Sequence, residues 1–384
     1  MKTIYLDNNA TTQIAPEVLD AMLPYLTKFY GNPGSSHRFG SHVAKKIAYA
    51  REQVAHLIGA HEDEIIFTSC GSEGDNTAIM SALHIKKDKR QIVISKVEHP
   101  AIRMLCNYLG NNGYTVTEIP VDTEGRLDMD MYEKSLTDDT VIVSIMWANN
   151  ETGVIFPVEE AACMAKERGI YFHTDAVQAV GKIPINLKDS SIDMLSLSGH
   201  KFHAPKGIGA LYVKRGTKYF PFLMGGHQEK GRRAGTENCA GIIGLGMACE
   251  LADKNMTGNI KGIKKLRDRF ENRILSDIQD SIINGTKDMR LPNTSNIGFK
   301  GIDAGALLSI IDEKYGICAS AGAACNAGST EPSHVLSAMD VPYEIAKGTV
   351  RFSFSTYNTE KETDFASEKI SETIKKIETA VKQR

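Results

Sequence analysis

Short apolar runs alternate with amphipathic stretches through the first half of the chain. Runs of strand length lie at 64–68, 91–95, 140–147, 170–175, 193–197 and 207–213. Helical spacing of apolar residues predicts helices from Pro16, over 43–58 and from about Asp75. Repeated strand, loop and helix units predict an α/β fold with a mainly parallel sheet covered on both faces.

The pattern changes after residue 257. The composition turns polar at 255–258, and we expect a charged helix at 261–275 to lead into strands near 295–299, 316–320 and 350–354. A last helix begins at Thr359, and its predicted inward residues are Phe365, Ile370, Ile374 and Ile377. Because 384 residues exceed what one core usually supports, we expect two domains: 15–257 as the large one, and 1–14 with 258–384 as the small one.

Composition narrows the function classes. The chain is 42% hydrophobic and 24% charged with a formal net charge of −2, which does not favour a nucleic-acid or membrane surface. The first residues do not resemble a signal peptide and no run is long enough to span a bilayer, so we expect a cytoplasmic protein. Seven cysteines without a CxxC pair argue against a disulfide framework or a protein-built metal cage.

Lys201 and Asp175 are the first candidate pair for chemistry. Lys201 lies on the short crossing between two predicted strands, and Asp175 ends the strand before them. A turn lysine is ordinarily a surface residue. A lysine that forms a Schiff base and an acid that faces a pyridinium nitrogen are, however, what pyridoxal phosphate requires from a protein. Gln178, three residues after Asp175, would then reach the phenolic oxygen of the ring.

Three further patterns carry two interpretations each. Gly71 and Ser72, between a strand and a helix, suit a phosphate or a simple helix cap. Arg351, within an apolar strand, suits a substrate carboxylate or an internal salt bridge. Cys325, in a run of small residues, suits a buried position or a mobile loop that carries its thiol to a cofactor.

Eight segments resemble the pyridoxal-phosphate cysteine desulfurases of the NifS/IscS type, within the class-V aminotransferases. They run in order through the chain: YLDNNATT, YGNPGSSH, EHPAI, NNETG, HTDAVQ, SGHKFHAPKGIG, RAGTEN and SAGAACNAGSTEPSHVL. The resemblance implies a fold-type I transferase with a seven-stranded, mainly parallel sheet in the large domain and a smaller α+β domain. One departure is Cys70-Gly71-Ser72, where the family is closer to TSGAT; serine retains the hydroxyl, so we expect phosphate binding to survive.

The resemblance also implies a role for each matching residue. Its catalytic residues are Cys325, Lys201 and His99. Its cofactor-binding residues are Gly71, Ser72, His99, Asn150, Asp175, Gln178, Ser198, His200, Lys201 and Thr236. Asn32 and Arg351 would bind the substrate. In the family, the threonine at the Thr236 position reaches the phosphate of the neighbouring subunit, which implies a homodimer.

The activity implied is removal of sulfur from L-cysteine, giving L-alanine and a persulfide on Cys325. Arg351 would hold the substrate carboxylate, Lys201 or His99 would move the Cα proton, and the Cys325 thiolate would attack the substrate sulfur. The family passes this sulfur to iron–sulfur cluster or thiolation pathways, often through a small scaffold protein, and its cysteine can transiently ligate a cluster. Rival readings are a selenocysteine lyase, an aminotransferase-like enzyme or an idle scaffold; a nicotinamide dehydrogenase is disfavoured because no GxGxxG follows the first strand.

Overall fold

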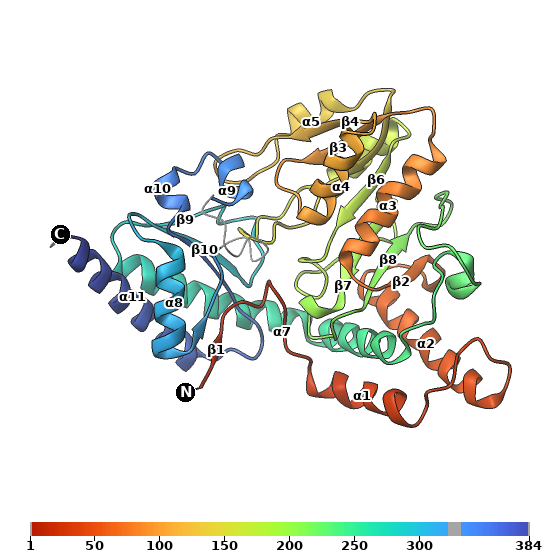
Figure 1. Cartoon of the computed structure of the whole chain (residues 1–384), viewed down its shortest axis with the longest axis horizontal. Helices are drawn as coiled ribbons and strands as arrows, with labels where there is room; N and C mark the ends of the chain where they lie inside the picture. The colour runs from red at the N-terminus through yellow and green to blue at the C-terminus, as the bar shows by residue number, and fades with distance from the viewer. Residues whose placement is uncertain (1, 322–331, 383–384) are drawn as a thin grey trace.

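A seven-stranded sheet forms the centre of the larger part of the molecule (Figure 1). This computed structural model describes residues 2–321 and 332–382. The strands, in spatial order, are β2 (Ile65–Thr68), β8 (Gly209–Val213), β7 (Met194–Ser198), β6 (Tyr171–Asp175), β5 (Thr140–Ser144), β3 (Gln91–Ser95) and β4 (Thr115–Ile119). Only β8 runs antiparallel to its neighbours in this sheet. The predicted mainly parallel, seven-stranded sheet is therefore confirmed.

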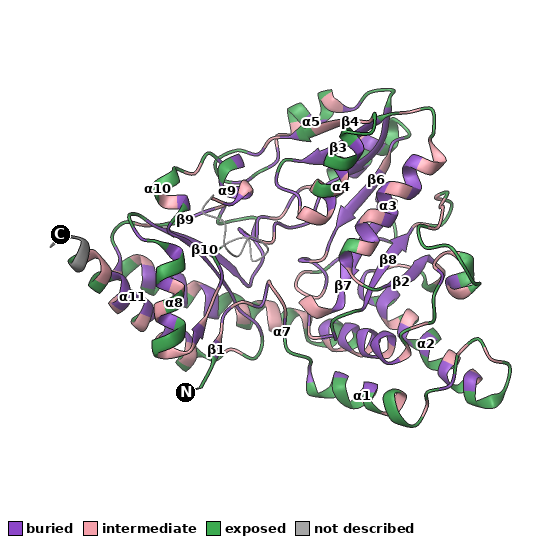
Figure 2. Cartoon of the chain, in the orientation of Figure 1, coloured by how far each residue is buried: buried purple, intermediate pink, exposed green. Residues whose placement is uncertain are grey.

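Helices cover both faces of this sheet. Alternate strand residues point to opposite faces: Ile92 and Ile142 pack with α3 (Gly71–Ile85) and α4 (Pro100–Gly110), whereas Val93 and Val143 pack in the cluster on the other face. That second cluster also takes in α2 (Arg38–Leu57), α5 (Met129–Ser135), α6 (Val158–Glu167) and the first part of α7 (Cys239–Asp277). We call these two clusters together the large-sheet core; its strands are buried almost throughout (Figure 2), except the edge strand β4, where only Ile119 is buried.

A second hydrophobic core lies around a smaller antiparallel sheet. This sheet has the order β12 (Thr349–Ser353), β10 (Thr294–Phe299) and β9 (Ser281–Ile283), and a separate parallel pair joins β1 (Ile4–Tyr5) to β11 (Ile317–Cys318). Helices α8 (Ala304–Tyr315) and α11 (Glu360–Lys382) pack in this second core, α10 (Tyr343–Ala346) contacts β10, and α9 (His334–Ala338) buries Val335 and Ala338 in the large-sheet core. Ile4, Phe270, Leu307, Phe352 and Ile370 pack together in what we call the small-sheet core.

The long helix α7 corrects one prediction. The polar residues 255–258 lie inside α7, which runs without interruption from Cys239 to Asp277 and contributes to both cores. The predicted helix at 261–275 is only its second part. Figure 1 shows α7 passing from the large-sheet side to the side of α8 and α11.

The apolar residues of two helices are not all buried. Helix α1 (Pro16–Thr27) begins where predicted, but Leu19, Leu23 and Leu26 are 49%, 52% and 59% exposed. In α11, Ile370 and Ile374 are buried as predicted, whereas Phe365 is 40% exposed because Ala366 takes the inward position one residue on. Helix α3 begins at Gly71, four residues earlier than expected.

Candidate active site

A cavity of about 320 Å³ opens where the carboxyl ends of β6 and β7 meet the start of α3. Ligands bind at this edge in open parallel sheets, outside the strand ends. Ten of the predicted residues line it: Gly71, Ser72, His99, Asn150, Asp175, Gln178, Ser198, His200, Lys201 and Arg351. They come from segments as far apart in sequence as residues 71 and 351, so the fold is what brings them together.

Asp175 is the last residue of β6 and is 6% exposed. The Val177 backbone N–H donates to its Oδ1 at 2.9 Å, which holds the carboxyl in place. Burial raises the pKa of Asp175, while His99, the Val177 hydrogen bond and Lys201 lower it. A carboxyl held at a strand end inside a cavity can face a protonated ring nitrogen.

Lys201 follows β7 in a single 3₁₀ turn, Gly199–Lys201. Its Nζ donates to the backbone carbonyls of Asn9 and Ala10, at 2.7 and 2.9 Å. The backbone of this turn is fixed from outside: Thr12 Oγ1 donates to the His200 carbonyl at 3.0 Å and accepts from the His203 N–H at 2.8 Å. His203 has a left-handed φ of 71°, an uncommon conformation that clusters at functional sites. The amine is thus presented to the cavity by a constrained loop.

His99 caps helix α4 with its imidazole. Its Nδ1 accepts from the Ala101 N–H at 3.1 Å, so in the neutral ring the proton is on Nε2. Burial lowers the pKa of His99, Asp175 opposes that shift, and Lys201 adds to it. The ring is therefore neutral at neutral pH and can stack on a planar group or carry a proton at Nε2.

The start of α3 has the properties of a phosphate seat. Cys70, at the cap position, makes no side-chain cap hydrogen bond, which leaves backbone N–H groups at the positive end of the helix. A Cβ on Gly71 would lie 2.6 Å from Val177 Cγ2, so only glycine allows this approach. Nearby, the Ser198 Oγ is buried with no hydrogen-bond partner among the described residues. An unpaired hydroxyl, a close-approach glycine and a helix N-terminus fit the phosphate end of pyridoxal phosphate.

His200 lines the same cavity. Its Nδ1 lies 3.1 Å from Thr11 Oγ1. Burial, with smaller contributions from Lys201 and neighbouring lysines, lowers the pKa of His200 to about 4, so its ring is neutral. Together with Asp175 and Lys201, which line the same cavity, the residues present supply a partner for each polar part of the cofactor.

Arg351 makes the internal ion pair that was one of its two predicted interpretations. Its guanidinium donates to Asp7 Oδ1 at 2.7 Å and to the Asn150 carbonyl at 3.0 Å, and the residue is 2% exposed. It nevertheless lines the cavity, and its Nε is buried without a partner in the described part of the chain. The ion pair therefore does not remove Arg351 from the site.

Two predicted residues lie elsewhere in this single chain. Asn32 and Thr236 are exposed and are not among the described residues that line the cavity. Their predicted roles in substrate and phosphate binding remain predictions. Cys325 lies outside the described residues.

Several lining residues were not singled out from the sequence. Asn9, Ala10, Asp75, Glu151 and His334 all border the cavity. Asn9 and Ala10 fall inside the YLDNNATT motif, which could have indicated that they lie at the cavity. Asp75 lies inside a helix, and nothing in the sequence indicated that it lines the cavity. Among the described residues no group of three or more side chains is arranged to hold a metal ion.

Comparison with known proteins gives the family. Residues 4–365 match the model of the aminotransferase class-V family. The chain belongs to this family. A cysteine desulfurase of Trichormus azollae is 56% identical over 377 residues, which cover 98% of this chain and 94% of that protein. Members of the class-V family of this kind depend on pyridoxal phosphate, which agrees with the fit of the cavity.

Two solved structures have the same fold as this class-V chain. One, titled a NifS-like protein, has a TM-score of 0.92 and 37% identity, and the match covers 97% of this chain and all of that one. Another, SspA in complex with cysteine, has a TM-score of 0.81 and 32% identity, covering 93% of this chain and all of that one. No helix in the described part of the chain is long and apolar enough to cross a membrane.

Proposed function

We propose that this chain is a cysteine desulfurase that uses pyridoxal 5′-phosphate to remove sulfur from L-cysteine, forming L-alanine. The observation that carries this proposal is the meeting of Lys201 and Asp175 in one cavity, beside a phosphate seat at the start of α3. The likeness to a cysteine desulfurase over 98% of the chain supports the same activity.

Each side chain has one task in this proposal. Pyridoxal phosphate, when bound, supplies the electron sink that allows bonds at the substrate Cα to break. Asp175 keeps a proton at the ring nitrogen, and Ser72, Ser198 and His200 bind at the phosphate end. Lys201 would tether the cofactor through its amine, and Lys201 or His99 would move the Cα proton. His99, which is neutral and carries its proton on Nε2, stacks on the ring and can exchange that proton.

Arg351 is the proposed carboxylate site, with Asn32 in support. A guanidinium has five N–H groups, and the buried Nε of Arg351 has no partner among the described atoms. Arg351 can therefore bind an incoming carboxylate while one edge remains on Asp7. Its burial strengthens such a charge-assisted contact because water competes less for it.

Cys325 is proposed as the sulfur acceptor. Its thiolate would attack the substrate sulfur, so that an S–S bond forms as the substrate C–S bond breaks and the carbon fragment becomes alanine. The persulfide would then pass to an iron–sulfur scaffold protein or a thiolation partner. The match of the SAGAACNAGSTEPSHVL segment to the desulfurases supports this role.

The test uses the purified holoprotein. It should be yellow, release alanine from L-cysteine, and show one added sulfur on Cys325 by mass spectrometry after single turnover. Cys325→Ala should keep the colour and lose sulfide release, with Cys163→Ala, an exposed thiol, as the matched control. A colourless protein that does not take up the cofactor would refute the proposal, and normal turnover by Cys325→Ala would remove the thiol from the mechanism.

We also infer a homodimer. The exposed Leu19, Leu23 and Leu26 form an apolar stripe on α1, and such stripes are usually covered by a partner. Thr236 is exposed in this single chain. A residue that binds the cofactor phosphate of a neighbouring subunit is expected to be exposed when that subunit is absent. Sedimentation of the purified protein tests this inference directly.

The predicted domain division and the predicted cytoplasmic location are also part of this proposal. Two separate cores support the division into a large domain, 15–257, and a small domain, 1–14 with 258–384, although α7 crosses the boundary.

The six cysteines of the described residues support a cytoplasmic location, because all of them are free thiols, as is usual in a reducing compartment.

A further inference from the structure

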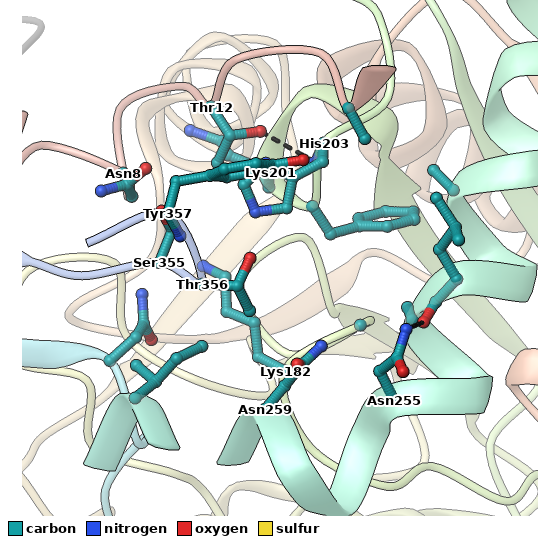
Figure 3. A pocket seen from close by; sticks show the side chains of 18 of the residues that line it. Asn8, Thr12, Lys182, Lys201, His203, Asn255, Asn259, Ser355, Thr356 and Tyr357 are labelled. Carbon is teal, nitrogen blue, oxygen red and sulfur yellow. Dashed lines mark hydrogen bonds between the residues drawn. The ribbon is translucent and has the colours of Figure 1, made fainter. Parts of the chain in front are cut away.

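A second cavity, of about 260 Å³, lies against the loop that carries Lys201 (Figure 3). Of the residues that line the two cavities in the described chain, only Lys201 is common to both. The second cavity is lined by Lys182 and by polar residues that include Asn8, Thr12, Asn255, Asn259, Asn293 and Ser355. Lys182 has no role in the function proposed above.

Lys182 makes its hydrogen bonds to neutral oxygens. Its Nζ donates to Gln178 Oε1 at 2.6 Å and to Asn9 Oδ1 at 3.3 Å. Within the described residues it forms no ion pair with a carboxylate. Burial lowers the pKa of Lys182 well below its ordinary value, and the positive charges of Lys201 and Arg351 lower it further. A lysine kept in so costly a position, with amide oxygens as its partners, needs an explanation beyond folding.

Two contacts, with Asn9 and with Lys182, fix which way the Gln178 amide points. Gln178 is 5% exposed and lines the cofactor cavity, and its Nε2 donates to the Asn9 carbonyl at 3.0 Å. The carbonyl can only accept, so the amide nitrogen must face Asn9, and the amide oxygen faces Lys182. A primary amide has two N–H bonds, and Asn9 takes one. The second is available to the cavity.

We propose that Lys182 is a positioning residue that locks and polarises the Gln178 amide, so that its second N–H donates to the phenolic oxygen of the cofactor. This inference rests on the proposed function, because it assumes that pyridoxal phosphate occupies the cavity. Lys182 on the amide oxygen draws electron density from the nitrogen and strengthens the N–H as a donor. It also holds Asn9, whose carbonyl accepts from the Lys201 amine.

The absorbance of the bound cofactor against pH gives a readout that overall folding does not move. A hydrogen-bond donor on the phenolic oxygen stabilises its negative charge, so this oxygen holds the proton that it shares with the Lys201 nitrogen less strongly. The donor therefore lowers the midpoint pH at which the absorbance changes. Lys182→Met removes the amine and should raise this midpoint by about half a pH unit to one unit, the scale of one hydrogen bond. Lys182→Arg keeps a donor and should stay near the wild-type midpoint. Lys188→Met, at an exposed lysine, is the matched control.

The cofactor band of wild type and the variant Gln178→Leu distinguish a failure of the proposed function from a failure of the inference about Lys182. A wild-type protein with no cofactor band would refute the proposed function. A band whose midpoint shifts in Gln178→Leu but not in Lys182→Met would leave the function standing and overturn the inference. The double variant Gln178→Leu/Lys182→Met should have the same absorbance midpoint as Gln178→Leu alone, because Lys182 acts through Gln178. A further shift of the midpoint in the double variant would contradict this mechanism.

A final pair of variants keeps the inference testable if the methionine is not tolerated. Lys182→Gln can accept as well as donate, so it should raise the midpoint, whereas Lys182→Arg should not. Equal midpoints in these two variants would overturn the inference.

Discussion

The acids beside the cofactor cavity are buried side chains with unusual proton affinity. Glu98 is fully buried; its Oε1 accepts from Ser95 Oγ at 2.5 Å and from the Met146 N–H at 2.9 Å, and its Oε2 has no partner among the described atoms. Burial raises the pKa of Glu98 to about 8. The pKa of Asp75 is also raised, by burial and by the negative charge of Asp175. His173, 3.6 Å from Asp75, does not neutralise it, because burial lowers the pKa of His173 to about 3.

Glu98 leads to a prediction about stability against pH. Between its ordinary pKa of 4.5 and about 8, the folded protein holds a proton that the unfolded chain has lost. The free energy of unfolding therefore falls as pH rises through this range and levels off above it. Glu98→Gln keeps the acceptor on Oε1 and removes the titration, so relative to wild type it should gain stability with rising pH, by at most about 5 kcal/mol.

Urea denaturation at about pH 6 and about pH 9 measures this difference. Glu118→Gln, at an exposed acid, should show no such pH-dependent gain. If the difference between Glu98→Gln and wild type is the same at both pH values, the raised pKa of Glu98 is wrong.

Arg351 shows what could and could not be inferred for single residues. Its position in an apolar strand indicated that it needs a partner, which the structure confirms. The identity of that partner, Asp7, lies 344 residues away in sequence, and β1 and β12 carry no local signal that joins them. Asp175 and Lys201 were easier to predict, because Asp175 ends one strand and Lys201 follows the next, and the apolar runs of both strands are visible in the sequence. The Lys182 contact with Gln178 was not predicted, although the two residues are four apart.

At the scale of elements, helix α7 shows why a polar stretch in the sequence need not end a helix. Glycine and polar residues at 255–258 lower local helix propensity, but tertiary packing on both sides of them overrides it. Helix α1 is the converse case. Its leucines have helical spacing, so the helix was predictable, but spacing does not tell whether an apolar stripe packs inside the chain or against another one.

The glycines of α7 provide a prediction with an internal control. Gly258 is exposed in mid-helix, and a Cβ there would meet nothing within 4 Å. Gly258→Ala should therefore raise the free energy of unfolding by about 0.5–1 kcal/mol, since alanine loses less backbone entropy. Gly246→Ala, in the same helix, should instead destabilise by about 1–3 kcal/mol, because its Cβ would lie 2.7 Å from Ala50 Cα.

Thermal melts of the two variants beside wild type measure both effects. The same sign of change in both would contradict the packing shown around α7. Gly262→Ala, also in open space, should behave like Gly258→Ala.

At the scale of the whole molecule, the N-terminal segment connects the two cores. Asn9 is 1% exposed; its Nδ2 donates to Thr294 Oγ1 at 2.9 Å and its Oδ1 accepts from Asn293 Nδ2 at 2.9 Å. Thr294 begins β10 of the small sheet, whereas the Asn9 carbonyl accepts from Gln178 and Lys201 beside the large sheet. The active-site cavity thus lies at the joint between the cores, and its residues also hold that joint together.

This arrangement predicts that Asn9→Ala uncouples the unfolding of the two cores. The variant leaves buried partners such as Asn293 and Thr294 with fewer hydrogen bonds, at a cost of roughly 2–4 kcal/mol. The chain has a single tryptophan, Trp147, which packs in the large-sheet core, so its fluorescence reports on that core alone. Circular dichroism reports on both.

In wild type the two signals should give the same midpoint of denaturation, as a cooperative transition requires. In Asn9→Ala the circular dichroism midpoint should fall below the fluorescence midpoint, because the smaller core loses the contacts that tie it to the larger one. Asn112→Ala, at an exposed asparagine, should leave the midpoints together. Coincident but lower midpoints in Asn9→Ala would mean that α7, which enters both cores, is enough to couple them without the N-terminal segment.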